Sequence, residues 1–207
     1  MFCLVALPSI SFFISNFGGK KHQLNKTLNP KLRRIWTTRD WERKISVFSV
    51  FFTRLKDHHL LTNHSKSLCV GARVGQEVEA LHRVGVLDAV GIDLVPYPPL
   101  VLKGDFHNQP FHNDTFDFEF SNVFDHALYP ERFAGEIERT LIPGGVCVLH
   151  VVVKGMADKY SANDLYSVAA VVELFRCSDL VGVREVDGFG ADTEVVLRKR
   201  KGGCGNG

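Results

Sequence analysis

Short apolar runs alternate with amphipathic segments from Ser67 almost to the end of the chain, and this alternation restricts the fold more than any other feature. Apolar runs bounded by turn residues are typical of buried strands, and the longer segments between them have helical periodicity. Alternating strands and helices favour a parallel sheet covered by helices on both faces. The expected strands are 67–71, 88–93, 99–103, 115–121 and 145–152, and the expected helices are 75–85, 130–141 and 163–177.

The C-terminal part of this region departs from the alternation. Two apolar segments, 180–187 and 193–199, are separated only by a short link that contains Gly188 and Gly190. So short a link joins antiparallel strands, because a parallel connection needs a crossover of about a dozen residues or more. We therefore predict an α/β fold of three layers, with a mostly parallel sheet and a C-terminal antiparallel hairpin.

The N-terminal segment differs in charge from the rest of the chain. Residues 1–39 contain seven Lys or Arg and no Asp or Glu, whereas 18 basic and 23 acidic side chains follow. The first 17 residues are mostly apolar, which leaves three alternatives: a membrane anchor with a cytosolic domain, a plastid or mitochondrial transit peptide, or an unstructured tail. The expected units are a leader (1–37), a helical cover (38–66), the main domain (67–200) and a flexible tail (201–207).

Charge and cysteine content argue against two kinds of partner. The formal net charge is only +2, so we expect no nucleic-acid-binding face. The five cysteines are widely spaced and form no C-x-x-C pair, so neither a disulfide framework nor a zinc site is expected. His107 and His112, between Asp105 and Asp114, match no compact ligand pattern, and no metal ligand is predicted.

Four strings occur in a fixed order: SLCVGARVGQEVEAL (67–81), VGIDLVP (90–96), KGDFHNQPF (103–111), and a longer string over 116–151 that contains IPGGVCVLHV. Together they resemble the class I S-adenosylmethionine-dependent methyltransferases of the type 11 group. TTRDWERK and EFSNVFDHALYPERF look most like a plant group of methyltransferases with a hydrophobic N-terminus. The resemblance implies a Rossmann-like methyltransferase fold, S-adenosylmethionine as cofactor and an unidentified methyl acceptor.

The resemblance also implies a cofactor site at the carboxyl ends of the strands. Gly71 and Gly75 bracket a turn that lets the backbone approach a ligand closely. Asp93 follows Gly71 by 22 residues and ends the next strand, where a carboxylate can accept hydrogen bonds from both ribose hydroxyls. Alternatively, Asp93 only caps the loop before Pro96. The other implied contacts are Asp105 with the adenine amino group, Phe106 beside the ring, and Ser121 and Asn122 along the methionine portion.

Two positions depart from the family pattern. The family usually has an acid where Cys69 stands and a third glycine where Arg73 stands. Arg73 either fills the place of the cofactor or pairs with its methionyl carboxylate. The missing acid at position 69 removes a partner for the cofactor's ammonium group. A non-catalytic interaction or regulatory domain therefore remains the alternative to an enzyme, whereas a nicotinamide dehydrogenase would need a G-x-G-x-x-G turn.

The catalytic demands of methyl transfer are modest, because the sulfonium is already activated and the protein mainly aligns the reactants. A base is needed only for a protonated acceptor, and the candidates are Asp125 and His126, with His150 as a third. Each can also be structural. Glu119, in the middle of a predicted central strand, needs a partner such as Arg139 or else marks a groove.

Overall fold

The computed structural model describes residues 29–153, 161–162 and 165–202. Its sheet has seven strands in the order β3-β2-β1-β4-β5-β7-β6. The first five strands run parallel, and β7 is antiparallel to both of its neighbours. The strands are β1 Ser67–Val70, β2 Ala89–Asp93, β3 Val101–Lys103, β4 Phe116–Ser121, β5 Leu141–Val151, β6 Ser178–Gly188 and β7 Ala191–Lys199.

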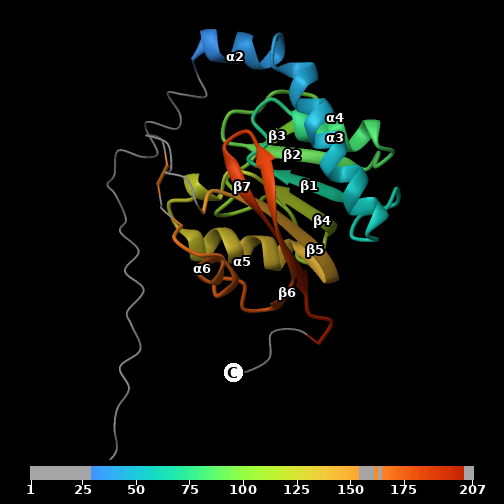
Figure 1. The fold of residues 1–207 in the computed structure, drawn as a ribbon, viewed down its shortest axis with the longest axis vertical. Helices are drawn as coiled ribbons and strands as arrows, with labels where there is room; N and C mark the ends of the chain where they lie inside the picture. Colours follow the sequence, from blue (N-terminus) through green and yellow to red (C-terminus); the bar gives the residue numbers. More distant parts are fainter. Residues whose placement is uncertain (1–28, 154–160, 163–164, 203–207) are drawn as a thin grey trace, which may run out of the picture.

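Helices cover both faces of this sheet, as Figure 1 shows, with α3 and α4 on one side and α5 and α6 on the other. Each face buries its own apolar cluster, one below α3 and α4 and one below α5. The predicted three-layer, mostly parallel Rossmann-like fold with its C-terminal hairpin is therefore confirmed. The helices are α2 Pro30–Thr37, α3 Trp41–Asp57, α4 Gln76–Arg83, the 3₁₀ turn η1 Phe124–His126, α5 Pro130–Thr140 and α6 Val168–Val172.

Helix α3 is held on the sheet by aromatic side chains at helical spacing. Phe48 and Phe52 are almost completely buried. The ring of Phe52 meets those of Phe118 and Phe120 edge to face, with centroid distances of 6.2 and 5.2 Å. Such geometry adds to the gain from burying the rings. The predicted amphipathic cover thus packs directly on β4.

The hairpin between β6 and β7 turns over two residues. Phe189 and Gly190 have φ angles of 57° and 104°, and Gly188 pairs with Ala191. Two consecutive positive φ angles are the requirement of the tight turn whose twist matches that of the flanking strands. The short glycine-containing link therefore produces the antiparallel pair that was expected.

Several expectations need correction. The helix predicted over 163–177 is much shorter, because α6 spans only Val168–Val172 among the described residues. Helix α2 was not predicted, yet its Trp36 is buried. Alternation along the strand 115–121 would place Phe116 and Phe118 on one face of the sheet, but Phe116 packs in the opposite cluster, where the pairing of β4 with β5 shifts register between these two residues.

Two of the cysteines, Cys69 and Cys147, are free and buried. Leader residues 1–28, tail residues 203–207 and most of the loop after β5 lie outside the described residues. Among the helices described, none combines the length and the apolar character that a membrane span requires.

Candidate functional site

The turn after β1 depends on its two glycines. Gly71 has a φ of 76°, and a Cβ atom there would lie 2.3 Å from Cγ2 of Val123. Gly75 precedes α4 with a φ of 88°, and a Cβ atom there would lie 2.8 Å from Cβ of Leu100. At both positions the positive φ angle and the lack of room for a Cβ atom exclude residues larger than glycine. The chain after β4 packs directly against the glycine-rich turn.

Asp93 ties this turn to the carboxyl end of β2. Its Oδ2 accepts a hydrogen bond from the backbone amide of Arg73 at 3.1 Å, and its Oδ1 accepts one from Val95 at 3.0 Å. Burial raises the pKa of Asp93, although both amides and the charges of Arg73 and Arg33 act in the opposite direction. A carboxylate has about four acceptor positions, so capacity for further donors remains. The loop-capping role is present, and ribose binding stays a prediction.

Arg73 turns its side chain toward the N-terminal helices. Its φ is 50°, and its guanidinium carbon lies 4.4 Å from the centroid of the Trp36 ring. The backbone oxygen of Trp36 accepts a hydrogen bond from the side-chain amide of Gln76 at 2.9 Å. These contacts place the end of α2 over the glycine-rich turn. The guanidinium is thus engaged in a cation–π contact at the edge of the predicted site.

The predicted methionine side is built around the end of β4. Ser121 is buried, and its hydroxyl donates to the backbone oxygen of Val70 at 3.0 Å. The side-chain amide of Asn122 donates to Oε1 of Glu77 at 3.3 Å. Ser121 therefore holds β4 to β1, and Asn122 orients a carboxylate from α4.

Glu77 is the site residue that sequence reasoning missed. It lies in the first turn of α4 with 7% of its surface exposed, and no described residue makes a hydrogen bond to its Oε2. Burial raises the pKa of Glu77, although the charges of Lys44 and Arg73 oppose this effect. In the sequence, an acid at a helix start looks like an ordinary partner of the helix dipole. Only the fold shows that its carboxylate points inward.

Asp105 and Phe106 follow β3 but are tied into local structure. Oδ1 of Asp105 accepts hydrogen bonds from the backbone amide of His107 at 2.9 Å and contacts Nδ1 of the same residue at 3.0 Å. Phe106 is 9% exposed and packs edge to face on Phe133, with 5.4 Å between ring centroids. The roles implied for these residues in adenine binding remain predictions. Among the described residues, no three His, Cys, Asp or Glu side chains gather as a metal ion would require.

Asp125 and His126 lie together in η1, just after β4. Nδ1 of His126 is 3.5 Å from Oδ2 of Asp125, which also accepts a hydrogen bond from the Ser161 hydroxyl at 2.6 Å. The backbone oxygen of Asp125 accepts a hydrogen bond from Ala162 at 2.7 Å. Asp125 therefore holds Ser161 and Ala162 beside η1.

His150 lies elsewhere. It is 2% exposed, and its ring packs between Phe51 and Phe120 with centroid distances of 4.8 and 4.9 Å. Its Nε2 is 3.0 Å from Oε2 of Glu194. These contacts give His150 a structural role in the core below α3.

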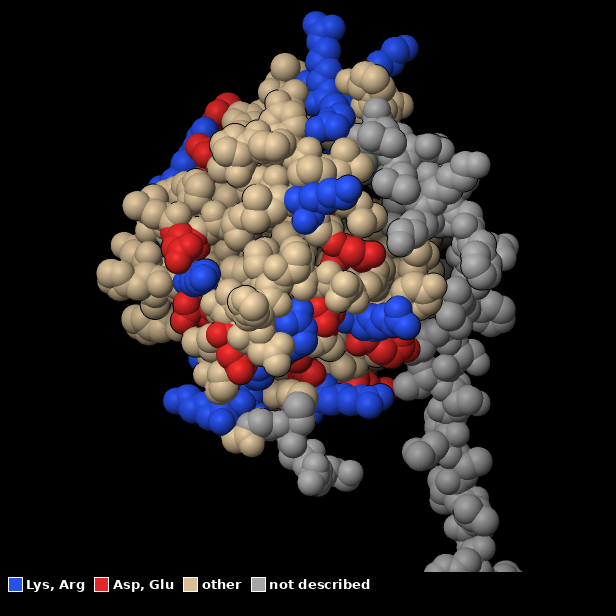
Figure 2. Space-filling model, turned by 180° about the vertical axis from the view of Figure 1, so that it is seen from behind, with Lys and Arg blue, Asp and Glu red and all other residues tan. Residues whose placement is uncertain are grey.

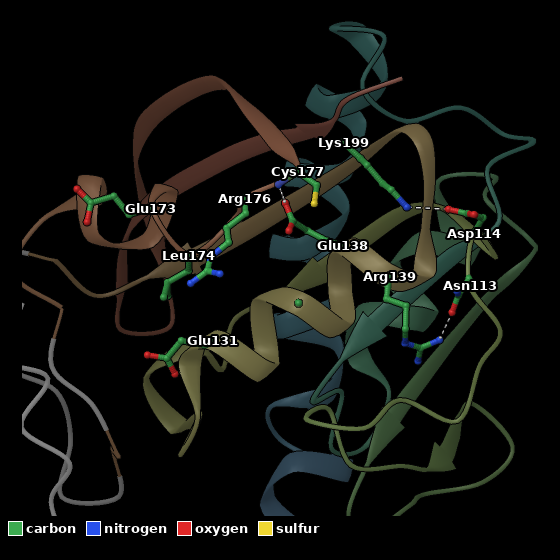
Figure 3. A pocket seen from close by; sticks show the side chains of 11 residues that line it. Asn113, Asp114, Glu131, Glu138, Arg139, Glu173, Leu174, Arg176, Cys177 and Lys199 are labelled. Atoms are coloured by element: carbon green, nitrogen blue, oxygen red, sulfur yellow. Dashed lines mark hydrogen bonds and ion pairs between the residues drawn. The ribbon is translucent and has the colours of Figure 1, made fainter. Parts of the chain in front are cut away.

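A hollow of about 880 Å³ opens beside α5, away from these residues (Figure 3). Its walls come from the segment before β4, from α5, from residues 173–177 and from the end of β7. Some of its charged groups are engaged with one another or with backbone: Nζ of Lys199 is 2.7 Å from Asp114, and Glu138 accepts from the Cys177 amide at 2.8 Å. It contains none of the predicted site residues.

Charge on the molecular surface is mixed where it can be seen. On the face shown in Figure 2, basic and acidic side chains lie next to each other along the lower part, below a broad area of uncharged residues. Basic residues do not gather there into one patch of the kind that nucleic-acid binding uses.

Comparison with known proteins places the predicted site inside a recognised domain. Residues 68–149 match the methyltransferase domain family, and this segment contains both glycines of the turn, Asp93, Asp105 and Asn122. A search of curated proteins gave no match.

Similar solved structures support the fold. The 1,6-didemethyltoxoflavin-N1-methyltransferase of Burkholderia thailandensis, solved with S-adenosylhomocysteine, is 15% identical with a TM-score of 0.64, covering 97% of this chain and 93% of that chain. An S-adenosylmethionine-dependent methyltransferase of Methanosarcina mazei is 14% identical with a TM-score of 0.53, covering 70% and 97%. The [4+2]-cyclase SpnF is 15% identical with a TM-score of 0.60, covering 73% and 80%. The fold of the chain is thus the one that class I methyltransferases have.

Proposed function

We propose that the chain binds S-adenosylmethionine and transfers its methyl group to an acceptor that is still unidentified. The observation that carries the proposal is Asp93, which ends β2 and is bonded to the glycine-rich turn inside the matched methyltransferase segment. Ligands of open α/β sheets bind at the carboxyl ends of the strands, where this turn and this acid meet.

The residues present suit the chemical groups of the cofactor. Asp93 retains acceptor capacity for ribose hydroxyls, and the inward carboxylate of Glu77 has an oxygen without a described hydrogen-bond partner. When bound, S-adenosylmethionine supplies an activated methyl group. The protein's part is to hold the ribose at Asp93 and to orient the acceptor beside η1, where Asp125 anchors Ser161. If the acceptor is protonated, His126 beside Asp125 is the nearest candidate base.

The alternative is a domain that keeps the fold without catalysis. Cys69 and Arg73 favour it, because both replace residues that the resembled family uses at its cofactor site. The cyclase SpnF has the same fold, so the fold alone does not fix methyl transfer. Titration of the full chain with S-adenosylmethionine by calorimetry separates the two proposals. If the chain does not bind S-adenosylmethionine at high micromolar concentration, the proposal of a methyltransferase fails and the non-catalytic domain remains.

Asp93→Ala is expected to weaken the binding of S-adenosylmethionine at least about tenfold, because hydrogen bonds to a charged group contribute about 1.5–3 kcal/mol each. Asp93→Asn should lose less, since its amide oxygen still accepts one bond. Calorimetric dissociation constants measure both effects.

Asp88→Ala is the matched control, because Asp88 is an exposed carboxylate at the opposite end of β2. It should bind the cofactor like the unaltered chain. Equal affinity of Asp93→Ala and the unaltered chain would remove Asp93 from the cofactor site.

A further inference from the structure

Strand β1 offers no anion to a cofactor. Cys69 occupies the position where the resembled family usually has an acid, and its side chain is 1% exposed. Burial raises the pKa of the Cys69 thiol well above its ordinary value, and the nearby charge of Glu77 raises it further. A neutral thiol cannot form an ion pair with an ammonium group. Glu77, in the first turn of α4, instead presents a buried carboxylate that is hydrogen-bonded to Asn122 after β4.

The Glu77 carboxylate is fixed in place and only partly satisfied. Asn122 donates to Oε1 at 3.3 Å, whereas Oε2 is buried and has no hydrogen-bond partner among the described residues. An ionised oxygen that is removed from water without a partner costs free energy. Oε2 of Glu77 can therefore accept a hydrogen bond from one more donor.

The surroundings of Glu77 are those of the proposed cofactor cleft. Glu77 lies two residues after Gly75, and its partner Asn122 directly follows the carboxyl end of β4. The charge of Arg73 acts on both Glu77 and Asp93. The two carboxylates thus lie close to the same arginine of the glycine-rich turn, with Asp93 at the end of β2 and Glu77 near β1 and β4.

We propose that Glu77 binds the α-ammonium group of S-adenosylmethionine and so replaces the acid that is missing at Cys69. This inference rests on the proposed function and adds a residue to its site. The buried oxygen of Glu77, its hydrogen bond to Asn122 and its place two residues after Gly75 are the observations that support it. Lys44 lies near enough to affect the carboxylate, and the ammonium group of the cofactor would add a direct donor.

The test compares S-adenosylhomocysteine with its analogue that lacks the α-amino group, by calorimetry on the full chain. The unaltered chain should bind S-adenosylhomocysteine at least about tenfold more tightly than the analogue, as a hydrogen bond between charged groups implies. Glu77→Gln should lose most of this difference by weakening only the ligand that carries the amino group. Affinity for the analogue should stay unchanged.

Glu79→Gln is the matched control on the same helix, because Glu79 pairs with Arg83 near the surface, with 2.9 Å between Oε1 and Nε. It should keep the full discrimination. If Glu77→Gln does not give a cooperative melt, Glu77→Asp, which shortens the side chain by one methylene, should show a reduced discrimination instead.

Two results would overturn the inference while leaving the proposed function intact. One is an unaltered chain that binds both ligands equally, and the other is a folded Glu77 variant that discriminates as well as the unaltered chain. Failure of the unaltered chain to bind either ligand would instead refute the proposed function, and the inference with it.

Discussion

Glu194→Ala is expected to lower the free energy of unfolding by about 3–5 kcal/mol, the usual effect of removing one partner from a buried ionic cluster. Glu194 in β7 is 1% exposed, and its Oε2 accepts hydrogen bonds from Arg54 of α3 and from His150 of β5. The variant leaves the partly buried Arg54 guanidinium without its carboxylate and creates a cavity below α3. Urea unfolding of the variant and the unaltered chain measures the difference.

Asp179→Ala is the control for this prediction. Asp179 also pairs with an arginine, Arg200, at 3.0 Å, but the two side chains are 67% and 35% exposed. Removing such an exposed pair should change the free energy of unfolding by less than about 1 kcal/mol. If the two variants were equally stable, the cluster around Glu194 would not hold α3 on the sheet.

The contribution of Glu194 to the free energy of unfolding changes with pH in a definite direction. Burial raises the pKa of Glu194, but hydrogen bonds and charges from His150 and Arg54 outweigh it and hold the pKa below the ordinary value of 4.5. A lowered pKa in the folded state means that the stabilisation is present above pH 4.5. It is lost as the pH falls through the folded-state pKa.

The elements that depend on local sequence could be predicted well. The glycines of the link between β6 and β7 fix a tight turn, and period-two and period-3.6 patterns distinguish strands from helices. Asp93 was placed at a strand end for the same reason. The end of a strand can be read from neighbouring residues, and all parallel strands present their carboxyl ends at one edge.

The partners of buried polar groups could not be predicted, because they come from distant parts of the chain. Gln76 donates to the backbone of Trp36, 40 residues earlier, and this contact accounts for part of the missed cover by α2. Arg139 was one partner suggested for Glu119, with a groove as the alternative. It pairs instead with Glu136, at 2.7 Å, and donates to the backbone oxygen of Phe111. Glu119 accepts hydrogen bonds from Thr140 and Gln109. Both side chains are uncharged, so the sequence does not mark them as partners of an acid.

The second large effect concerns Glu119, whose neutral form the fold favours. Burial raises the pKa of Glu119 to about 8, against opposing hydrogen bonds from Thr140 and Gln109 and the charge of Arg139. Oε1 accepts a hydrogen bond from the Thr140 hydroxyl at 2.5 Å, and Oε2 accepts one from Gln109 at 3.4 Å. Between pH 4.5 and 8 the unfolded chain loses this proton and the folded chain keeps it. Stability from this group therefore falls as the pH rises.

The free energy of unfolding should fall by on the order of 2 kcal/mol between pH 6 and 8 because of Glu119, since one proton corresponds to about 1.4 kcal/mol per pH unit. Glu119→Gln removes the titrating group and should abolish this part of the slope. Urea unfolding at several pH values measures it, and the difference between the two chains cancels the histidines that titrate in the same range. Glu131→Gln, at an exposed position of α5, should keep the slope of the unaltered chain. Parallel slopes for Glu119→Gln and the unaltered chain would mean that Glu119 is ionised in the folded protein. In that case the hydrogen bonds from Thr140 and Gln109, together with the charge of Arg139, would have to stabilise a full negative charge in the core.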